Sequence, residues 1–239
     1  MALNEEYEDL SEIQKRYDSR KTTQHKPVIL IATGSYCPIH KGHLQVFDTA
    51  AKFLLETHNI EVLAGYLSPS SDIYVGKKLK DECIPFDHRV RMAKLACKEH
   101  NSQPNCIPVF VSTWEGLQPK FVSHYNVTQR FREKIHSLYP RINVFYIAGS
   151  DLFRRCPIYR WKRVVVIQRP GVEEKFSVEN FQTDFHNRVY ICNDPKYSEH
   201  YIEASSTQIR NKHQNGEPID DITYQSVIDY LENELGWKK

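Results

Sequence analysis

Apolar positions along the chain alternate between short continuous runs and helical spacings. The first run covers residues 28–32, the pattern of a strand that is buried on both faces of a parallel sheet. A glycine turn follows at Gly34. Apolar residues then recur at helical spacing, which predicts an amphipathic helix over residues 43–57. The ordered part of the chain is therefore expected to begin with a strand, a turn and a helix.

The same alternation continues to the end of the chain. Continuous apolar runs predict further strands at residues 60–66, 109–111, 144–148, 164–167 and 189–192. Helical spacings predict further helices at residues 86–97, 127–138 and 224–235, and one that begins at Ser205. This order predicts the α/β class, as a Rossmann-like three-layer αβα sandwich with a parallel sheet. Ligands of such sheets bind beyond the carboxyl ends of the strands, so we expect the chemistry there.

The first 25 residues are strongly polar and precede the first apolar run. We expect residues 1–25 to form an extension outside the fold, with a helix over residues 3–17. Residues 26–239 would then form one domain, because single α/β domains often reach this length.

Composition limits the classes of partner. The chain has 32 Lys and Arg against 30 Asp and Glu, a formal net charge of +2, which does not favour non-specific nucleic-acid binding. No apolar run approaches the ~20 residues that cross a bilayer, and the acidic N-terminus lacks a secretory signal. Six cysteines without a Cys-x-x-Cys pair indicate reduced thiols. We expect no nucleic acid or membrane partner and a cytoplasmic protein, with the nucleus as the open alternative.

The turn after the first strand carries candidate chemistry. Neither a Gly-x-Gly-x-x-Gly nor a Gly-x-x-x-x-Gly-Lys-Ser/Thr motif is present, which removes the main support for dinucleotide dehydrogenases and P-loop enzymes. A glycine turn at Gly34 and the start of a helix still offer free amides and a positive dipole end to a phosphate. His40 and His43, three positions apart, can add hydrogen bonds. An isolated pair of this kind is more often without a special role.

A second cluster begins the helix after the last strand. Ser205, Ser206 and Thr207 supply hydroxyls at its cap, and Arg210 follows one turn later. Hydroxyls, free amides and a guanidinium together suit a polyanion. Alone, such a sequence is usually only a helix cap.

Together the two clusters resemble the paired motifs of the nucleotidylyltransferase superfamily, His-x-Gly-His and Ser-Ser/Thr-x-x-Arg. Residues 68–74 and 113–118, with Gly149 to Asp151 and Trp161, resemble the eukaryotic nicotinamide/nicotinate mononucleotide adenylyltransferases in particular. The resemblance runs in order from residue 27 to the C-terminal helix. It implies the HxGH-type nucleotidylyltransferase fold.

The resemblance also implies a reaction. The 5′-phosphate of nicotinamide mononucleotide, or of nicotinate mononucleotide, attacks the α-phosphorus of ATP, which gives NAD or deamido-NAD and pyrophosphate in NAD biosynthesis. The displacement is direct and in line, without a covalent enzyme intermediate. Mg²⁺, or another divalent cation, would be held mainly by the substrate phosphates and water.

The family's site residues carry over by position. The resemblance makes His40, His43 and Arg210 the catalytic residues. It assigns ATP binding to Gly34, Ser35, Tyr36, His40, His43, Gly149, Asp151, Ser205, Ser206, Thr207 and Arg210. It assigns mononucleotide binding to Ser35, Tyr36, Lys77, Trp114 and Trp161. The spacing does not settle whether Lys77 or Lys78 takes the lysine's place.

Several positions depart from the family pattern. Many eukaryotic members carry threonine in place of His40, asparagine is frequent in place of Cys37, and Asn-Asp-Ile often stands where this chain has Ile-Glu-Ala at residues 202–204. Two other functions therefore stay open: a sister enzyme that transfers a nucleotide to pantetheine phosphate, flavin mononucleotide or a phospho-alcohol, and an inactive nucleotide-binding module. We expect a homo-oligomer, although the sequence does not give the number of subunits.

Overall fold

A six-stranded parallel sheet forms the centre of this computed structural model, which describes residues 7–20, 24–155, 163–168, 189–197, 202 and 204–237. The strand order is β3-β2-β1-β4-β5-β6, and every neighbouring pair is parallel. The strands are β1 (Lys26–Gly34), β2 (Ile60–Pro69), β3 (Val109–Val111), β4 (Asn143–Gly149), β5 (Val164–Ile167) and β6 (Val189–Cys192). All six were predicted from the apolar runs.

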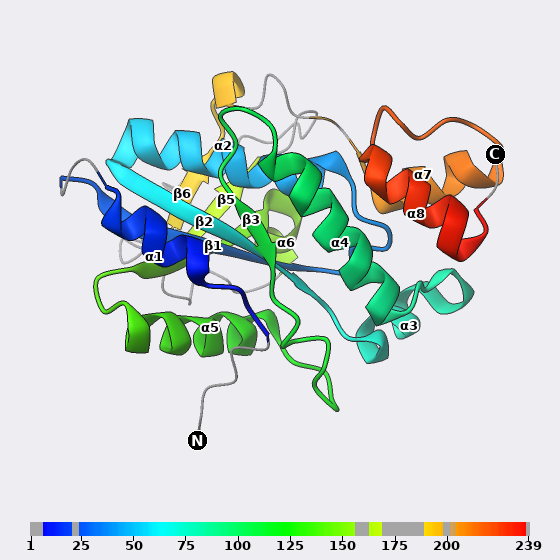
Figure 1. The fold of residues 1–239 in the computed structure, drawn as a ribbon, viewed down its shortest axis with the longest axis horizontal. Helices are drawn as coiled ribbons and strands as arrows, with labels where there is room; N and C mark the ends of the chain where they lie inside the picture. Colours follow the sequence, from blue (N-terminus) through cyan, green and yellow to red (C-terminus); the bar gives the residue numbers. More distant parts are fainter. Residues whose placement is uncertain are drawn as a thin grey trace.

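Helices cover both faces of this sheet (Figure 1). They are α1 (Ser11–Asp18), α2 (Lys41–His58), α3 (Asp72–Leu79), α4 (Phe86–Asn101), α5 (His124–Leu138), α6 (Ser150–Arg155), α7 (Ser206–Gln214) and α8 (Gln225–Leu235). Short 3-10 turns span Lys80–Glu82 and Pro195–Tyr197. The helices predicted within residues 26–239 are confirmed with ends within a few residues, whereas the helix predicted over residues 3–17 begins only at Ser11, and residues 7–10 are not helical. Helices α3 and α6 were missed because each is short and has few buried apolar positions.

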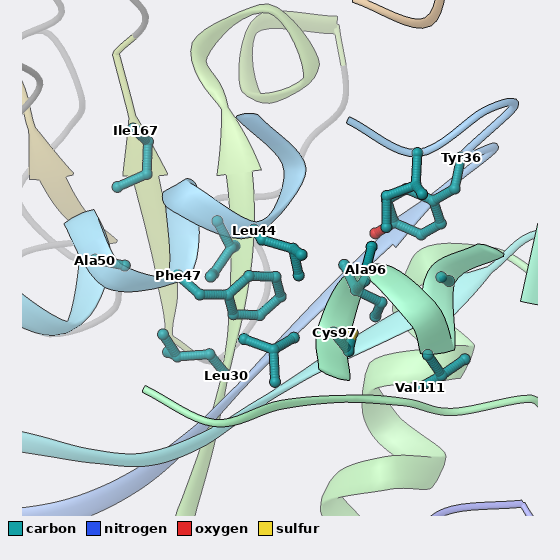
Figure 2. Packing of buried hydrophobic residues seen from close by; sticks show 14 of the residues in the cluster. Leu30, Tyr36, Leu44, Phe47, Ala50, Ala96, Cys97, Val111 and Ile167 are labelled. Carbon is teal, nitrogen blue, oxygen red and sulfur yellow. The ribbon is translucent and has the colours of Figure 1, made fainter. Parts of the chain in front are cut away.

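Alternate residues of β1 belong to two different cores, which confirms the three-layer sandwich. Leu30 faces the core shared with α2, α4 and α8, where it lies near Phe47 and Leu44 (Figure 2). Ile29 and Ile31 face the opposite core, shared with α1 and α5. Burial of β1 on both faces explains its continuous apolar run.

The strand order reverses between β1 and β4. Pairing of β1 with β4 ends at Ile31 and Tyr146, whereas pairing with β2 continues to Gly34. Beyond that point β1 and β4 are linked by a 2.8 Å hydrogen bond between the hydroxyls of Thr33 and Tyr146. The carboxyl ends of β1 and β4 thus border the switch-point crevice in which open α/β sheets bind ligands.

The N-terminal segment packs into the fold, so the prediction of an extension outside it does not hold for residues 7–18. Ile13 is completely buried in the core on the α5 side. Buried Glu8 accepts hydrogen bonds from Lys134 at 2.7 Å, from Ser112 at 2.6 Å and from Arg130. Burial alone would raise the pKa of Glu8, but the three hydrogen-bond donors outweigh it and lower the pKa below its usual value. Hydropathy missed this segment because its contacts depend on partners about a hundred residues away.

Two further expectations concern membrane-spanning helices and the redox state of the cysteines. Among the helices in the described ranges, none has both the length and the apolar content that crossing a bilayer requires. Cys37, Cys83, Cys97, Cys106 and Cys192 are free thiols, as expected. Cys156 lies outside the described residues.

Candidate active site

The loop after β1 is held in a strained but well-packed conformation. Tyr36 has a φ of 46°, and its buried hydroxyl donates a 3.0 Å hydrogen bond to the carbonyl of Ala32. Its ring lies over Gly34, where an added Cβ would come within 2.9 Å of ring atoms. Burial raises the pKa of Tyr36 well above its usual value, so the phenol stays neutral. Because the ring of Tyr36 lies so close, position 34 requires glycine.

His40 and His43 form the first turn of α2 as a stacked pair. Their ring centroids are 3.5 Å apart, and the backbone N–H of His40 donates to Nδ1 of His43 at 3.1 Å. A neutral imidazole that accepts a hydrogen bond at Nδ1 carries its proton on Nε2. The helix cap thus fixes His43 as an Nε2–H donor. Gly42 is tightly enclosed, since a Cβ there would meet the carbonyl of Ile202 at 3.1 Å.

Helix α7 meets this same loop, although it lies about 170 residues later in the sequence. The hydroxyl of Ser206 donates to the carbonyl of Pro38 at 2.8 Å, and Nη1 of Arg210 donates to the carbonyl of Cys37 at 2.9 Å. Nε of Arg210 pairs with Glu82 at 3.0 Å, and Nη2 lies 3.3 Å from the hydroxyl of Thr207. The two predicted motifs therefore lie together.

Both helices begin at this loop and present amides there. Ser205 caps α7 by accepting the N–H of Gln208 at 3.1 Å, while the Gln208 side chain accepts the N–H of Ser205 at 2.9 Å. This capping box leaves the N–H groups of Ser206 and Thr207 without intrahelical acceptors. The positive ends of two helix dipoles and an imidazole N–H thus surround one loop, an arrangement that favours bound phosphate.

Arg89 is a second arginine that holds this loop, and motif analysis missed it. Its side chain is completely buried and donates to the carbonyls of Ser35 at 2.8 Å, Ser70 at 2.7 Å and Ile84 at 2.9 Å. It also pairs with Asp72 at 2.8 Å. The only signal in the sequence is a basic residue among the buried positions of α4, and this does not reveal its partners.

Glu115, in the turn after β3, is the buried acid of this edge of the sheet. It is 4% exposed and accepts a 2.7 Å hydrogen bond from the hydroxyl of Ser68 at the end of β2. Burial raises the pKa of Glu115 to about 7, although hydrogen bonds from Ser68 and Ser70 and the charge of Arg89 oppose the shift. A carboxyl group that titrates near neutrality at the ligand-binding edge is a candidate functional group.

A family model described as cytidylyltransferase-like matches residues 31–212, a range that includes both motifs and the loop after β1 at which they meet. The chain belongs to the cytidylyltransferase-like family. The predicted membership in the wider nucleotidylyltransferase group is thereby confirmed.

Relatives within this cytidylyltransferase-like family narrow the resemblance. The chain is 36% identical over 228 residues to nicotinamide/nicotinic acid mononucleotide adenylyltransferase 2 of Saccharomyces cerevisiae, covering 86% of this chain and 55% of the relative. It is 26% identical to the Arabidopsis thaliana nicotinamide/nicotinic acid mononucleotide adenylyltransferase, covering 92% and 93%. Of the fungal relatives that it matches, the chain spans between 25% and 55% of the length.

A solved structure agrees with the cytidylyltransferase-like fold. The nicotinic acid mononucleotide adenylyltransferase of Plasmodium falciparum, complexed with APC, superimposes with a TM-score of 0.60 over 89% of this chain and 98% of that protein. The sequence identity is 20%, so this likeness concerns the fold alone.

The other predicted residues that lie within the described ranges come at or after the ends of β2, β3 and β4 in the chain. Gly149 ends β4 across the switch point from β1, and exposed Asp151 lies in the first turn of α6. Half-buried Trp114 packs against the core on the α5 side, with the guanidinium of Arg130 5.1 Å from its ring centroid. Lys77 lies exposed in the last turn of α3. Trp161 lies outside the described residues.

The polar groups near the two motifs suit a cation that enters the site bound to the substrate phosphates. Within the described ranges, the single group of three metal-ligating side chains is Asp48, His100 and Cys106, and none of these belongs to the loop between β1 and α2. At that loop the polar groups are imidazoles, hydroxyls, amides and a guanidinium. Such donors bind phosphate oxygens, while Mg²⁺ keeps several waters and few protein ligands in sites of this kind.

Proposed function

We propose that this protein is a nicotinamide/nicotinate-nucleotide adenylyltransferase of NAD biosynthesis. It transfers AMP from ATP to the 5′-phosphate of nicotinamide mononucleotide, and also of nicotinate mononucleotide. The main support for the proposal is that His43 and the start of α7 lie together at the loop after β1. The relatives support the choice of acceptor, since they are nicotinamide/nicotinic acid mononucleotide adenylyltransferases.

The reaction needs positioning and charge stabilisation. A phosphate oxygen of the mononucleotide forms a bond to the α-phosphorus of ATP, and the bond from that phosphorus to the bridging oxygen breaks, so pyrophosphate leaves. Negative charge builds on the oxygens of the phosphates that are transferred and released. The Nε2–H of His43 and the amides at the starts of α2 and α7 donate to these oxygens, where a fixed donor favours the transition state.

No protein nucleophile is required at this site. Cys37 is the thiol nearest to both motifs, and it is completely buried with its sulfur accepting the N–H of Ile84 at 3.2 Å. Burial raises the pKa of the Cys37 thiol, which keeps it protonated and unreactive. This agrees with a direct displacement between the two substrates.

Arg210 would change partners when ATP binds. Its present partner Glu82 is 44% exposed, so the carboxylate can move into solvent and release the guanidinium to a phosphate. Ser205, Ser206 and Thr207 complete this cradle with hydroxyls and amides, and His40 supports it as the stacked neighbour of His43. A Mg²⁺ ion bound to the triphosphate supplies further neutralisation of charge.

The two nucleosides would lie on either side of the phosphates. We assign the adenosine to the end of β4, at Gly149 and Asp151. We assign the mononucleotide to the backbone of Ser35 and Tyr36 with Trp114, Lys77 and Trp161, since a flat cationic pyridinium ring binds well to a tryptophan face. A homo-oligomer in the cytoplasm or nucleus completes the proposal.

The decisive experiment is an assay with ATP, Mg²⁺ and nicotinamide mononucleotide, followed by detection of NAD and pyrophosphate. Equal amounts of the two products are expected, and nicotinate mononucleotide should give deamido-NAD. Turnover of pantetheine phosphate or flavin mononucleotide instead would identify a sister nucleotidylyltransferase. Binding of ATP with no turnover of any of these acceptors would identify an inactive module.

His43→Ala tests the assignment of the donor. Loss of one transition-state donor costs a factor of about 10² or more in kcat, so the variant should lose at least this much activity while it stays folded. His136→Ala is the matched control, because His136 is exposed in the last turn of α5 and should leave kcat unchanged. A folded His43→Ala protein with normal turnover would refute the assigned role.

A further inference from the structure

A second cluster of chemically reactive side chains lies away from the proposed active site. Asp48 is in α2, His100 is near the end of α4, and Cys106 is in the loop that leads from α4 into β3 (Figure 1). One ligand atom from each residue lies within 4.8 Å of the other two. Because this loop precedes β3, the cluster is at the amino end of that strand, whereas the two phosphate-binding motifs meet at the loop beyond the carboxyl end of β1.

The imidazole of His100 directs a nitrogen into this cluster. The side chain is almost completely buried, and its Nδ1 lies 3.3 Å from the hydroxyl of Tyr224. Its Nε2 is buried with no hydrogen-bond partner among the described residues, and the nearest acidic oxygen, Oδ2 of Asp48, is 3.4 Å away. A buried nitrogen without a hydrogen bond is costly. A bond from Nε2 to a metal would remove that cost.

Tyr224 is placed to orient this imidazole for metal binding. Metal-ligating histidines usually donate the N–H of their other ring nitrogen to an oxygen, which fixes the tautomer and the ring. A proton on Nδ1 that is donated to the hydroxyl of Tyr224 leaves the lone pair of Nε2 free. The contact between His100 and Tyr224 is therefore the kind of hydrogen bond that orients a metal-binding histidine.

Asp48 is held in place and can be reached from solvent. Its Oδ1 accepts the backbone N–H of Ile107 at 2.9 Å, and its Oδ2 faces His100. The side chain is 27% exposed. Asp48 also lines a surface cavity of about 510 Å³ together with Asn105 and Ile107. A hydrated ion can thus reach the carboxylate, and a water molecule can fill a further coordination position.

Cys106 completes a donor set of three different types. Without an ion, Cys106 is a free thiol that carries its proton, and its sulfur lies within 4.8 Å of the ligand atoms of Asp48 and His100. A bound divalent ion displaces that proton to solvent, because thiolate is the form that ligates metals. Cys106 thus supplies the soft sulfur donor of the set.

We propose that Asp48, His100 and Cys106 form a Zn²⁺ site with water in the fourth position. Thiolate, imidazole and carboxylate are the ligands of zinc, whereas Mg²⁺ prefers oxygen alone. In a tetrahedral site with bonds of about 2.0 to 2.3 Å, ligand atoms are about 3.3 to 3.8 Å apart. Nε2 of His100 and Oδ2 of Asp48 are already 3.4 Å apart, and no two ligand atoms of the cluster are more than 4.8 Å apart, so the longest separation must shorten by about 1 Å at most.

Such a site would tie three elements together. It would join α2 to the end of α4 and to the loop that enters β3, and so would add to the hydrogen bond from Ile107 to Asp48 and the polar contact between Asp48 and His100. Helix α2 also carries His43 in its first turn. The ion would act as a structural clip rather than as part of the transfer reaction.

Cobalt(II) tests the proposal on the wild-type chain, reduced and freed of metal. Co²⁺ titration in excess Mg²⁺ should saturate at one equivalent, with a thiolate-to-cobalt charge-transfer band in the near ultraviolet and d–d bands typical of tetrahedral coordination. Zn²⁺ should abolish these bands by displacement. Absence of the charge-transfer band in the folded wild-type protein would overturn the proposal, whatever its enzymatic activity.

Three variants assign the ligands. Cys106→Ser should lose the charge-transfer band, and Asp48→Asn should bind Co²⁺ at least about 10-fold more weakly, a lower bound set by the effect of outer-sphere partners in known sites. Cys83→Ser is the matched control, because Cys83 is also partly buried but lies outside the cluster and should keep the band. Retention of the band in Cys106→Ser, or its loss in Cys83→Ser, would contradict the assignment.

Thermal unfolding gives an independent readout. An ion that binds only the folded chain raises its melting temperature by mass action. Micromolar Zn²⁺ should raise the melting temperature of wild type and of Cys83→Ser, and should leave that of Cys106→Ser unchanged. An equal rise in all three proteins would place the zinc elsewhere and would overturn the proposal.

Discussion

Two buried arginines from different helices hold the loop after β1. They differ in which of their hydrogen-bond partners can move away. Arg89, from α4, makes four hydrogen bonds, three to backbone carbonyls and one to Asp72. Arg210, from α7, makes three, of which one goes to a backbone carbonyl and two go to side chains. Carbonyls are fixed by the fold, whereas the carboxylate of Glu82 can rotate into solvent.

This difference separates a structural role from a functional one. Three of the five N–H groups of Arg89 donate to backbone carbonyls, which cannot leave, so the guanidinium stays on the loop even if Asp72, which is 51% exposed, moves away. Arg210 keeps two N–H groups beyond its three bonds and has an exposed acid as its partner. A guanidinium with these properties can exchange a carboxylate for a phosphate of similar geometry.

The largest expected effect is on stability, in Arg89→Ala. Removing the guanidinium leaves the carbonyls of Ser35 and Ser70 buried without a donor, and loss of one partner of a buried pair costs about 3–5 kcal/mol. Urea unfolding should show a loss of this size. Arg91→Ala, on the exposed side of α4, is the matched control and should change stability by less than about 0.5 kcal/mol. A small change in Arg89→Ala would remove the contrast with Arg210.

Arg210→Lys should affect turnover more than folding. A lysine keeps the charge but not the fork of donors, and loss of an electrostatic contact to the transition state costs about 10²–10³ in kcat. The melting temperature should fall only slightly, since the carbonyl of Cys37 still has a cation within reach. Normal kcat together with a large loss of stability would place Arg210 in the same structural class as Arg89.

Glu115→Gln tests the third charged group at this edge of the sheet. Burial raises the pKa of Glu115 from 4.5 to about 7, so the stability given by its neutral form is complete below pH 4.5 and is lost as the pH rises through about 7. The loss is about 3 kcal/mol at most. The variant should gain stability over wild type by up to this amount between pH 4.5 and about pH 8. Parallel pH profiles of unfolding would disprove the shift.

Glu82→Gln should have the smallest effect. Its carboxylate is 44% exposed, and ion pairs at such positions contribute about 0–1 kcal/mol. If Glu82 is only a partner that Arg210 releases, kcat should stay within a few-fold of wild type, and the KM for ATP should not rise. A loss of turnover as large as that of Arg210→Lys would show that the pair acts as a unit.

The strands were predictable because burial on both faces imposes a continuous apolar run. Three of them, at residues 109–111, 164–167 and 189–192, have the predicted bounds. Helix α7 was found from its cap, and Ser205 does accept the N–H of Gln208. The junction of the two motifs followed from topology, since both follow strand ends of one parallel sheet.

Other features were not predictable because they depend on partners that are distant in sequence. Arg89 is part of an ordinary amphipathic helix until the carbonyls of the β1 loop are placed around it. Glu115 has a raised pKa only because the sheet buries it. Residues 7–18 contain too few apolar positions to indicate packing, although Ile13 and Glu8 fill places that the domain provides.

The proposed reaction requires that one triphosphate binds between the starts of α2 and α7. The most direct measurement is a crystal structure of this chain with Mg²⁺ and a non-hydrolysable ATP analogue. We predict phosphate oxygens within hydrogen-bond distance of Nε2 of His43 and of the amides of Ser206 and Thr207, with Arg210 turned from Glu82 to the phosphates. Phosphates bound away from both helix starts, with Arg210 still paired to Glu82, would contradict the account.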